Sequence, residues 1–246
     1  MTGCLVQVIV TSGYDPPCDL ETGMNFVQWL NSLDELLYEL MSWLVFVPVT
    51  LWRIVTRPLA TMRYAEEQLA LEDGRQYRAT VSPPVMLILS VALSQAIDLA
   101  IGYTNPIVAS RRGLAGLVND NLTLLLLRVV LFGVFPLLLA VRKVQRAGAR
   151  VDRDTLKPPF YAQCYAASPL AFLISAGTAG INHAVPEVQL VGSVAVMLGF
   201  IFYAVIQVRW FGQELGQSVA RSVFDTAAAL ITGIVIFFLV GVLFVR

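Results

Sequence analysis

The chain has 246 residues, of which 57% are hydrophobic and 14% are charged, and its 17 basic residues balance 17 acidic ones. A net charge of zero gives no general attraction to nucleic acid, and no basic run with interleaved aromatic residues occurs, so we expect no nucleic acid partner. Three widely spaced cysteines, Cys4, Cys18 and Cys164, fit neither a disulfide framework nor a set of metal ligands.

Residues 1–35 form an acidic head. The first 52 residues contain no Lys or Arg, and Asp15, Pro16 and Pro17 interrupt a short apolar start, so we expect no cleaved signal peptide. The apolar residues Leu5–Val10 predict either a short strand or an unordered tail.

The segment 36–82 is predicted to hold an interfacial helix followed by a basic and polar cytoplasmic stretch. Leu36–Val55 is apolar enough to cross a bilayer, which would make it a sixth span. It also carries an acidic residue and two tryptophans and runs into basic residues, a composition typical of an amphipathic helix in the membrane interface. We favour the interfacial helix and keep the sixth span as the alternative. Thr61–Gly74 then predicts a polar helix that ends at its glycine.

Residues 83–246 contain five apolar blocks, each near the length of a bilayer crossing. A hydrocarbon core of about 30 Å needs about 20 apolar residues when it is crossed by a helix. We therefore predict an all-α fold, a polytopic transmembrane helical bundle of five spans preceded by the N-terminal interfacial helix. The blocks are Pro84–Tyr103, Leu122–Val141, Tyr165–Ile181, Val188–Val208 and Thr226–Val245.

The basic residues are distributed unequally between the two sides of such a bundle. If every block crosses, thirteen of the 17 Lys and Arg residues fall on one side, most of them before the first block or in the loop 142–157. Because basic residues favour the cytoplasmic side, we predict a cytoplasmic loop and an outside C-terminus. Six residues of this loop are candidate contacts for anionic lipid headgroups: Arg142, Lys143, Arg146, Arg150, Arg153 and Lys157.

Two stretches containing prolines stand at the start of predicted spans. Arg57-Pro58, Tyr77-Arg78 and Ser82-Pro83-Pro84 lead into the first block, and Phe160–Leu170, FYAQCYAASPL, opens the third. Both stretches resemble the Yip family of five-span membrane proteins, whose eukaryotic members interact with Rab GTPases, and the related bacterial Yip-like proteins. The resemblance covers the chain from Arg57 to its end. It implies the five-span fold and a role in membrane organisation or trafficking, and it implies no catalytic chemistry. No residues of this sequence match the determinants of Rab binding.

Ionisable side chains inside a span cost a few kcal/mol each, so each one is a candidate site. Asp98 in the first block and Arg128 in the second lie at similar depths, on the order of 10 Å below the outer surface at 1.5 Å per residue. Consecutive spans are usually neighbours, so we predict a buried ion pair, with Gln95 one turn from Asp98 on the same face. The pair either locks two helices together, which we favour, or lines a cavity that binds or passes a solute. His183 belongs to this candidate site, although its place between two blocks fits a loop residue better than a ligand.

Small residues indicate where spans approach one another closely. The third block ends in Ser175–Gly180, and the fourth contains Gly192, Ser193 and Gly199, so we expect these two spans at the centre of the bundle. Pro136 lies deep inside the second span and is expected to kink it near Phe132.

No catalytic or metal-binding motif occurs, so we expect a protein that is not an enzyme and needs no cofactor. Asp225 at the start of the last span fits the favourable end of a helix dipole, and Gly212–Gly216 lies in a polar loop, so neither suggests a site. The favoured function, which follows the resemblance, is that of a Yip-like scaffold, assembly or membrane-organising factor integral to the cytoplasmic (inner) membrane of a bacterium. Its partners would be the lipid bilayer and either another membrane protein or a second copy in a homo-oligomer. The alternative is a small permease or channel with its polar site around Asp98 and Arg128.

Overall fold

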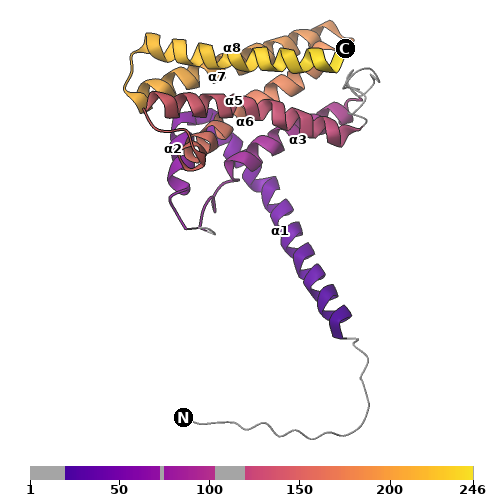
Figure 1. Cartoon of the computed structure of the whole chain (residues 1–246). Coiled ribbons are helices and arrows are strands. Elements are labelled where there is room, and N and C mark those ends of the chain that lie inside the picture. Colours follow the sequence, from indigo (N-terminus) through magenta and orange to yellow (C-terminus); the bar gives the residue numbers. More distant parts are fainter. Residues whose placement is uncertain (1–19, 73–74, 103–119, 246) are drawn as a thin grey trace, which may run out of the picture. The chain divides into compact units, whose positions relative to one another are not determined.

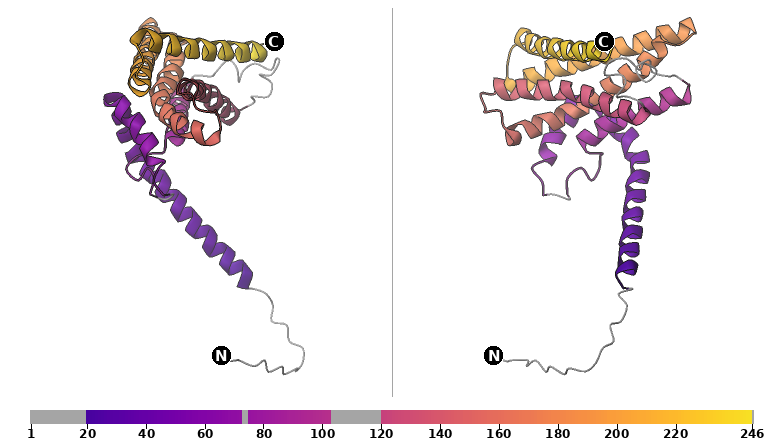
Figure 2. Two further views of the ribbon diagram at one scale, coloured as in Figure 1. Left: turned by 60° about the vertical axis from the view of Figure 1, so that its left-hand side comes forward. Right: turned by 45° about the vertical axis from the view of Figure 1, so that its right-hand side comes forward.

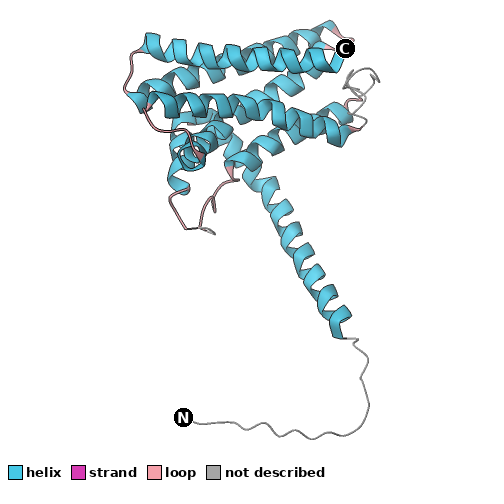
Figure 3. Cartoon of the chain, viewed as in Figure 1, coloured by secondary structure: helices cyan, strands magenta, loops and turns pink. Residues whose placement is uncertain are grey.

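The described part of the chain folds into helices, as its computed structural model shows (Figure 1). The structure describes residues 20–72, 75–102 and 120–245, and every regular element in these ranges is a helix (Figure 3). The all-α prediction is therefore confirmed, while the strand or tail considered for Leu5–Val10 lies outside the described residues. The helices are α1 (Leu20–Thr56), α2 (Pro58–Gln68), α3 (Pro83–Ala100), α5 (Asn121–Arg146), α6 (Arg153–Ile181), α7 (Pro186–Leu215) and α8 (Val219–Val245).

Six segments are long and apolar enough to cross a membrane, as in a multi-pass membrane protein. Five of them lie in α3, α5, α6, α7 and α8 and correspond to the five predicted blocks. The sixth, Leu33–Thr56, lies in α1 and covers the stretch for which we favour an interfacial helix. Its length and composition suit the alternative of a sixth span, and its place in the interface stays a prediction.

The chain divides into two compact units, Met1–Trp43 and Leu44–Arg246. The described part of the first unit is the beginning of α1, where Leu36, Leu37 and Tyr38 are exposed apolar side chains. The second unit contains the end of α1 and all the other helices. All contacts discussed below lie within this second unit.

Several helices extend beyond their apolar blocks. The predicted loop Arg142–Lys157 is wrong, because α5 continues to Arg146 and α6 begins at Arg153. Asp152 starts α6: its carboxylate accepts hydrogen bonds from the backbone N–H groups of Asp154 and Thr155, at 3.1 and 2.9 Å. These N–H donors hold the pKa of Asp152 below its usual range, since they stabilise the charged carboxylate.

The predicted ends of two other helices also differ from the structure. Gly212 lies in the last turns of α7 and not in a loop, because the helix continues to Leu215 and ends where Gly216 adopts a left-handed φ of 58°. The helix α2 ends at Gln68, before the glycine predicted to terminate it. The helix α5 continues through Pro136, and the kink expected there stays a prediction.

The helices α3 and α5–α8 form a bundle in which α6 is central. The helix α6 packs against α2, α3, α5 and α7, and α8 packs against α5 and α7 (Figure 2). The bundle has two ends. At one, α5 and α7 end and α6 and α8 begin; we call it the basic end, because α5 finishes in Arg142, Lys143 and Arg146. At the opposite end, α3 and α6 end and α5 and α7 begin.

Glycines bring α6 and α7 into backbone contact, as predicted. A Cβ atom added at Gly192 would lie 2.5 Å from the carbonyl oxygen of Gly177 and 2.7 Å from the backbone nitrogen of Ile181. A Cβ atom at Gly177 would lie 2.8 Å from the carbonyl oxygen of Gly192. In a bilayer, where the hydrophobic effect does not drive helices together, such close approach provides much of the attraction between them.

We predict that Gly192→Ala destabilises the bundle, because the added methyl group meets backbone atoms that cannot rotate away. Overpacking of this kind costs about 1–3 kcal/mol, measurable as a lower Tm in mild detergent. Gly133→Ala in α5 is the matched control, because its new Cβ meets no atom within 4 Å and alanine favours helices by up to about 1 kcal/mol. Equal stability of the two variants would contradict the close α6–α7 contact.

Candidate functional site

The predicted ion pair between Asp98 and Arg128 is confirmed. The Nη1 atom of Arg128 on α5 lies 3.0 Å from Oδ2 of Asp98 on α3 and donates a second hydrogen bond of 2.6 Å to Oε1 of Gln95. The side chain of Gln95 also reaches Oδ1 of Asn121, at 3.5 Å. Gln95 and Asp98 are one turn apart on α3, which is why both face the same guanidinium. Asp98 is 3% exposed, so the pair is buried at the opposite end of the bundle.

His183 does not join this pair through any hydrogen bond among the described residues. It lies in the turn between α6 and α7, as predicted for a loop residue. Its Nδ1 atom accepts a hydrogen bond from the backbone N–H of Val185 at 3.2 Å, and its carbonyl oxygen accepts one from Gln189 at 2.8 Å. These contacts give His183 a local role in shaping the turn.

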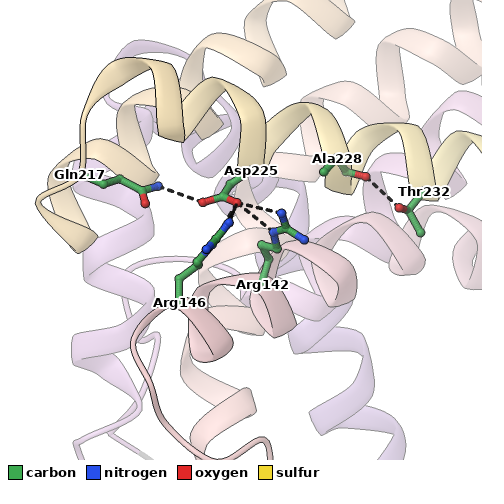
Figure 4. Close-up of polar contacts among 6 residues, drawn as sticks. All are labelled: Arg142, Arg146, Gln217, Asp225, Ala228 and Thr232. Carbon is green, nitrogen blue, oxygen red and sulfur yellow. Dashed lines mark hydrogen bonds and ion pairs between the residues drawn. The ribbon is translucent and has the colours of Figure 1, made fainter.

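A second and larger charge cluster, missed by the sequence analysis, surrounds Asp225 at the basic end (Figure 4). The side chain of Asp225 on α8 is 0% exposed, and its Oδ1 atom accepts hydrogen bonds from two arginines of α5. The Nη2 atoms of Arg142 and Arg146 lie 2.8 and 2.6 Å from it, and their Nε atoms lie 3.1 and 3.0 Å away. Gln217 donates to the other carboxylate oxygen at 3.4 Å.

This cluster joins α5 to α8, and it gives Asp225 a role beyond the helix dipole assigned to it above. Arg142 and Arg146 are one turn apart on α5, so both guanidinium groups reach the same carboxylate. Two turns further along α8, the hydroxyl group of Thr232 instead donates a hydrogen bond within its own helix, to the carbonyl oxygen of Ala228 at 2.8 Å (Figure 4). In the sequence, the four-residue spacing of Arg142 and Arg146 was the one sign that both side chains could face the same partner.

Lys143 lies between these arginines in sequence but pairs in another direction. Its Nζ atom lies 2.8 Å from Oε1 of Glu66 on α2 and 3.5 Å from Oε2 of Glu214 on α7. It also lies 4.5 Å from the ring centroid of Trp210, a cation–π contact. Arg63 of α2 completes the group, with its Nε atom 3.0 Å from Oε1 of Glu214. Burial raises the pKa of Glu66, while the neighbouring Lys143 ammonium offsets part of that rise.

The clusters share one organisation, in which α5 supplies cations and its neighbours supply carboxylates. The helix α5 contains four basic residues and no acidic one. Its partners are Asp98 of α3, Glu66 of α2, Glu214 of α7 and Asp225 of α8. Ion pairs therefore tie α5 to four other helices, at both ends of the bundle.

Three of the six candidate headgroup contacts are thus engaged in ion pairs within the protein: Arg142, Lys143 and Arg146. The other three, Arg150, Arg153 and Lys157, are exposed and make no ion pair with the acidic residues that the structure describes. The Nζ atom of Lys157 lies 5.8 Å from the ring centroid of Tyr161, a cation–π contact. The cations open to headgroups lie at the α5–α6 connection and on the first turns of α6.

A buried amide pair between α6 and α7 was also missed. The Nε2 atom of Gln163 donates to Oε1 of Gln207 at 2.9 Å, and Nε2 of Gln207 donates back to Oε1 of Gln163 at 2.6 Å. Both side chains are 0% exposed. A reciprocal pair satisfies polar groups that would be costly to leave unpaired in an apolar interior.

The two stretches that carry the family resemblance pack against each other. The hydroxyl group of Tyr165 on α6 donates to the carbonyl oxygen of Val81 at 2.6 Å and lies 3.1 Å from Oγ1 of Thr80. The rings of Tyr77 and Tyr161 stack with their centroids 6.4 Å apart. These contacts fix the segment before α3 onto the start of α6.

The described side chains offer no cluster of three or more His, Cys, Asp or Glu residues that could hold a metal ion. A hollow of about 810 Å³ with a largely apolar lining lies between α5, α6, α7 and α8 and is lined by residues such as Phe135, Phe200 and Phe237. None of the charged residues described above lines it. The arrangement thus provides helix-to-helix ion pairs and exposed cations, and an apolar hollow separate from both.

Comparison with protein-family models, with characterised proteins and with solved structures finds no match to this chain.

We predict that Asp225→Asn lowers the free energy of unfolding by about 3–5 kcal/mol, because it leaves two guanidinium groups without a counter-charge. The measurement is unfolding of the purified full chain in mild detergent, followed by circular dichroism. Glu72→Gln is the matched control, since Glu72 forms an exposed pair with Arg75 at 3.7 Å, and such pairs contribute little. An Asp225→Asn variant as stable as this control would show that the cluster does not hold α5 to α8.

Proposed function

We propose that this chain is a non-catalytic integral membrane protein that acts as a scaffold, assembly or membrane-organising factor. One observation carries the proposal: the ion pairs buried in the bundle join one helix to another. Buried ionisable groups in membrane proteins commonly mark solute pathways, but such groups also serve to lock helices when each meets an opposite charge. Here Asp98 and Asp225 each meet at least one arginine of α5.

The exposed cations of the basic end supply the surface for this role. Arg150, Arg153 and Lys157 would attract anionic lipid headgroups at about 1 kcal/mol each. The predicted orientation, with the basic end in the cytoplasm of a bacterium and the C-terminus outside, would direct them toward the inner leaflet of the cytoplasmic membrane. The resemblance to Yip-like proteins supports the same theme, with another membrane protein or a second copy as partner.

One observation favours the alternative of a small permease or channel. The Oδ1 atom of Asp98 is buried and has no hydrogen-bond partner among the described residues. An unsatisfied carboxylate oxygen beside Arg128 and Gln95 would be able to bind a cation or a proton during transport. The scaffold is favoured because the other oxygen of Asp98 already has its counter-ion.

The test uses the full chain reconstituted in phosphatidylcholine vesicles. These vesicles should associate with protein-free vesicles that contain phosphatidylglycerol, as measured by light scattering. Replacing Arg150, Arg153 and Lys157 by Gln should weaken the association roughly 100-fold, since about 3 kcal/mol of attraction is lost. Changing Arg150 and Arg153 to Lys is the control, because it keeps the charges and should keep the association.

The same vesicles, loaded with a pH-sensitive dye, test the alternative. The scaffold predicts no proton flux above that of protein-free vesicles. Flux that requires the protein and disappears in Asp98→Asn would overturn the scaffold in favour of a permease. Unchanged association after loss of the three cations would overturn the proposed lipid-binding surface.

A further inference from the structure

A groove of about 720 Å³ opens on the second unit where the start of α2 meets α6 and α7. Its apolar side is formed by Leu173 of α6 and by Leu198, Ile201 and Val205 of α7. The guanidinium-bearing residues Arg57 and Arg209 also line it. The groove therefore combines apolar walls with two cations.

The apolar residues form a continuous stripe that leads to one of the cations. Leu198, Ile201, Val205 and Arg209 follow at spacings of three and four, which places them on one face of α7. Their apolar members are 53%, 52% and 49% exposed in chain order. From Leu198 to Arg209 the helix rises by about 16 Å, roughly half of the ~30 Å hydrocarbon core, which is the depth of one leaflet.

The two arginines are free to bind an anion. Both are exposed, and neither forms an ion pair or a side-chain hydrogen bond within the described residues. Arg63 and Arg142, by contrast, are paired inside the protein. Arg57 comes from the junction of α1 and α2 and Arg209 from α7, so the two cations approach the groove from different helices.

Arg209 also marks the point where the surface becomes polar. A second hollow, of about 620 Å³, continues from Arg209 and Val205 past Gln213 and Gln217 toward the start of α8. An occupant with an acyl chain in the apolar groove would thus place its charged group at the arginines and any polar extension beside the glutamines. This order of apolar, cationic and polar surfaces matches the order of groups in a phospholipid.

We propose that this groove binds one anionic phospholipid. The phosphate lies between Arg57 and Arg209, whose guanidinium groups suit phosphate oxygens, and one acyl chain lies along Leu198, Ile201 and Val205. The site is separate from the exposed cations of Arg150, Arg153 and Lys157. If the groove does not bind lipid, the proposed function is unaffected. If the proposed function is wrong, the groove can still bind lipid.

Native mass spectrometry of the full chain, released from mild detergent after exposure to phosphatidylglycerol or phosphatidylcholine, tests the charge recognition. We expect one phosphatidylglycerol to be retained per chain in preference to phosphatidylcholine. The double variant Arg57→Gln/Arg209→Gln should lower the affinity for phosphatidylglycerol about 30-fold, because each lost cation lowers it about 5-fold. Arg75→Gln/Arg221→Gln removes the same charge from exposed residues that do not line the groove, and should retain the lipid.

Ile201→Trp tests the acyl chain separately, because it fills the groove and leaves both arginines in place. It should displace the lipid, whereas Ile231→Trp, at a residue of α8 that is 61% exposed and outside the groove, should not. Three results would each overturn the proposal. The chain would retain phosphatidylcholine as well as phosphatidylglycerol, the Arg75/Arg221 control would lose as much lipid as the Arg57/Arg209 variant, or inorganic phosphate alone would displace the lipid. If Ile201→Trp does not fold, the arginine variants decide the question by themselves.

Discussion

The bundle depends on one constraint: a charge placed among apolar helices must meet an opposite charge within the protein. The helix α5 supplies the opposite charge to carboxylates on four other described helices. It carries Arg128 at one end and Arg142, Lys143 and Arg146 at the other, and it has no acidic residue. Each helix that contributes one of these buried or half-buried carboxylates is thereby tied to α5.

A second, uncharged set of contacts complements the ion pairs. The helices α6 and α7 approach through Gly177 and Gly192, closely enough that a methyl group would not fit. The amide pair of Gln163 and Gln207 then adds two hydrogen bonds at a position with no exposure. The ion pairs tie α5 to α2, α3, α7 and α8, while the glycines and the amide pair hold α6 and α7 close together.

The predictions from sequence succeeded where a residue's depth in a span carried the information. Asp98 and Arg128 lie at matching depths in consecutive spans, so their pairing followed from the span map alone. The close approach of α6 and α7 was predicted from another signal, the small residues within their apolar blocks.

The cluster around Asp225 was missed because it depends on where helices end. Apolar content locates the middle of a span, but the capping of α6 by Asp152 and the continuation of α5 to Arg146 are set by local hydrogen bonds. With a loop assumed over 142–157, Arg142 and Arg146 had no common face and no reason to reach α8. The pairing of Lys143 was missed for a further reason: its partners, Glu66 of α2 and Glu214 of α7, lie far from it in sequence.

The proposed scaffold and the proposed lipid groove both use cations that the ion pairs leave free, and the scaffold also requires that the buried charges be structural. A double-mutant cycle on Asp98 and Arg128 measures this directly, with the unfolding free energy of the full chain in mild detergent as the readout. Asp98→Leu and Arg128→Met should each cost about 3–5 kcal/mol, and the double variant should recover most of that loss because no unpaired charge remains. Single variants as stable as the parent, or a double variant as unstable as the sum of the two, would contradict the account.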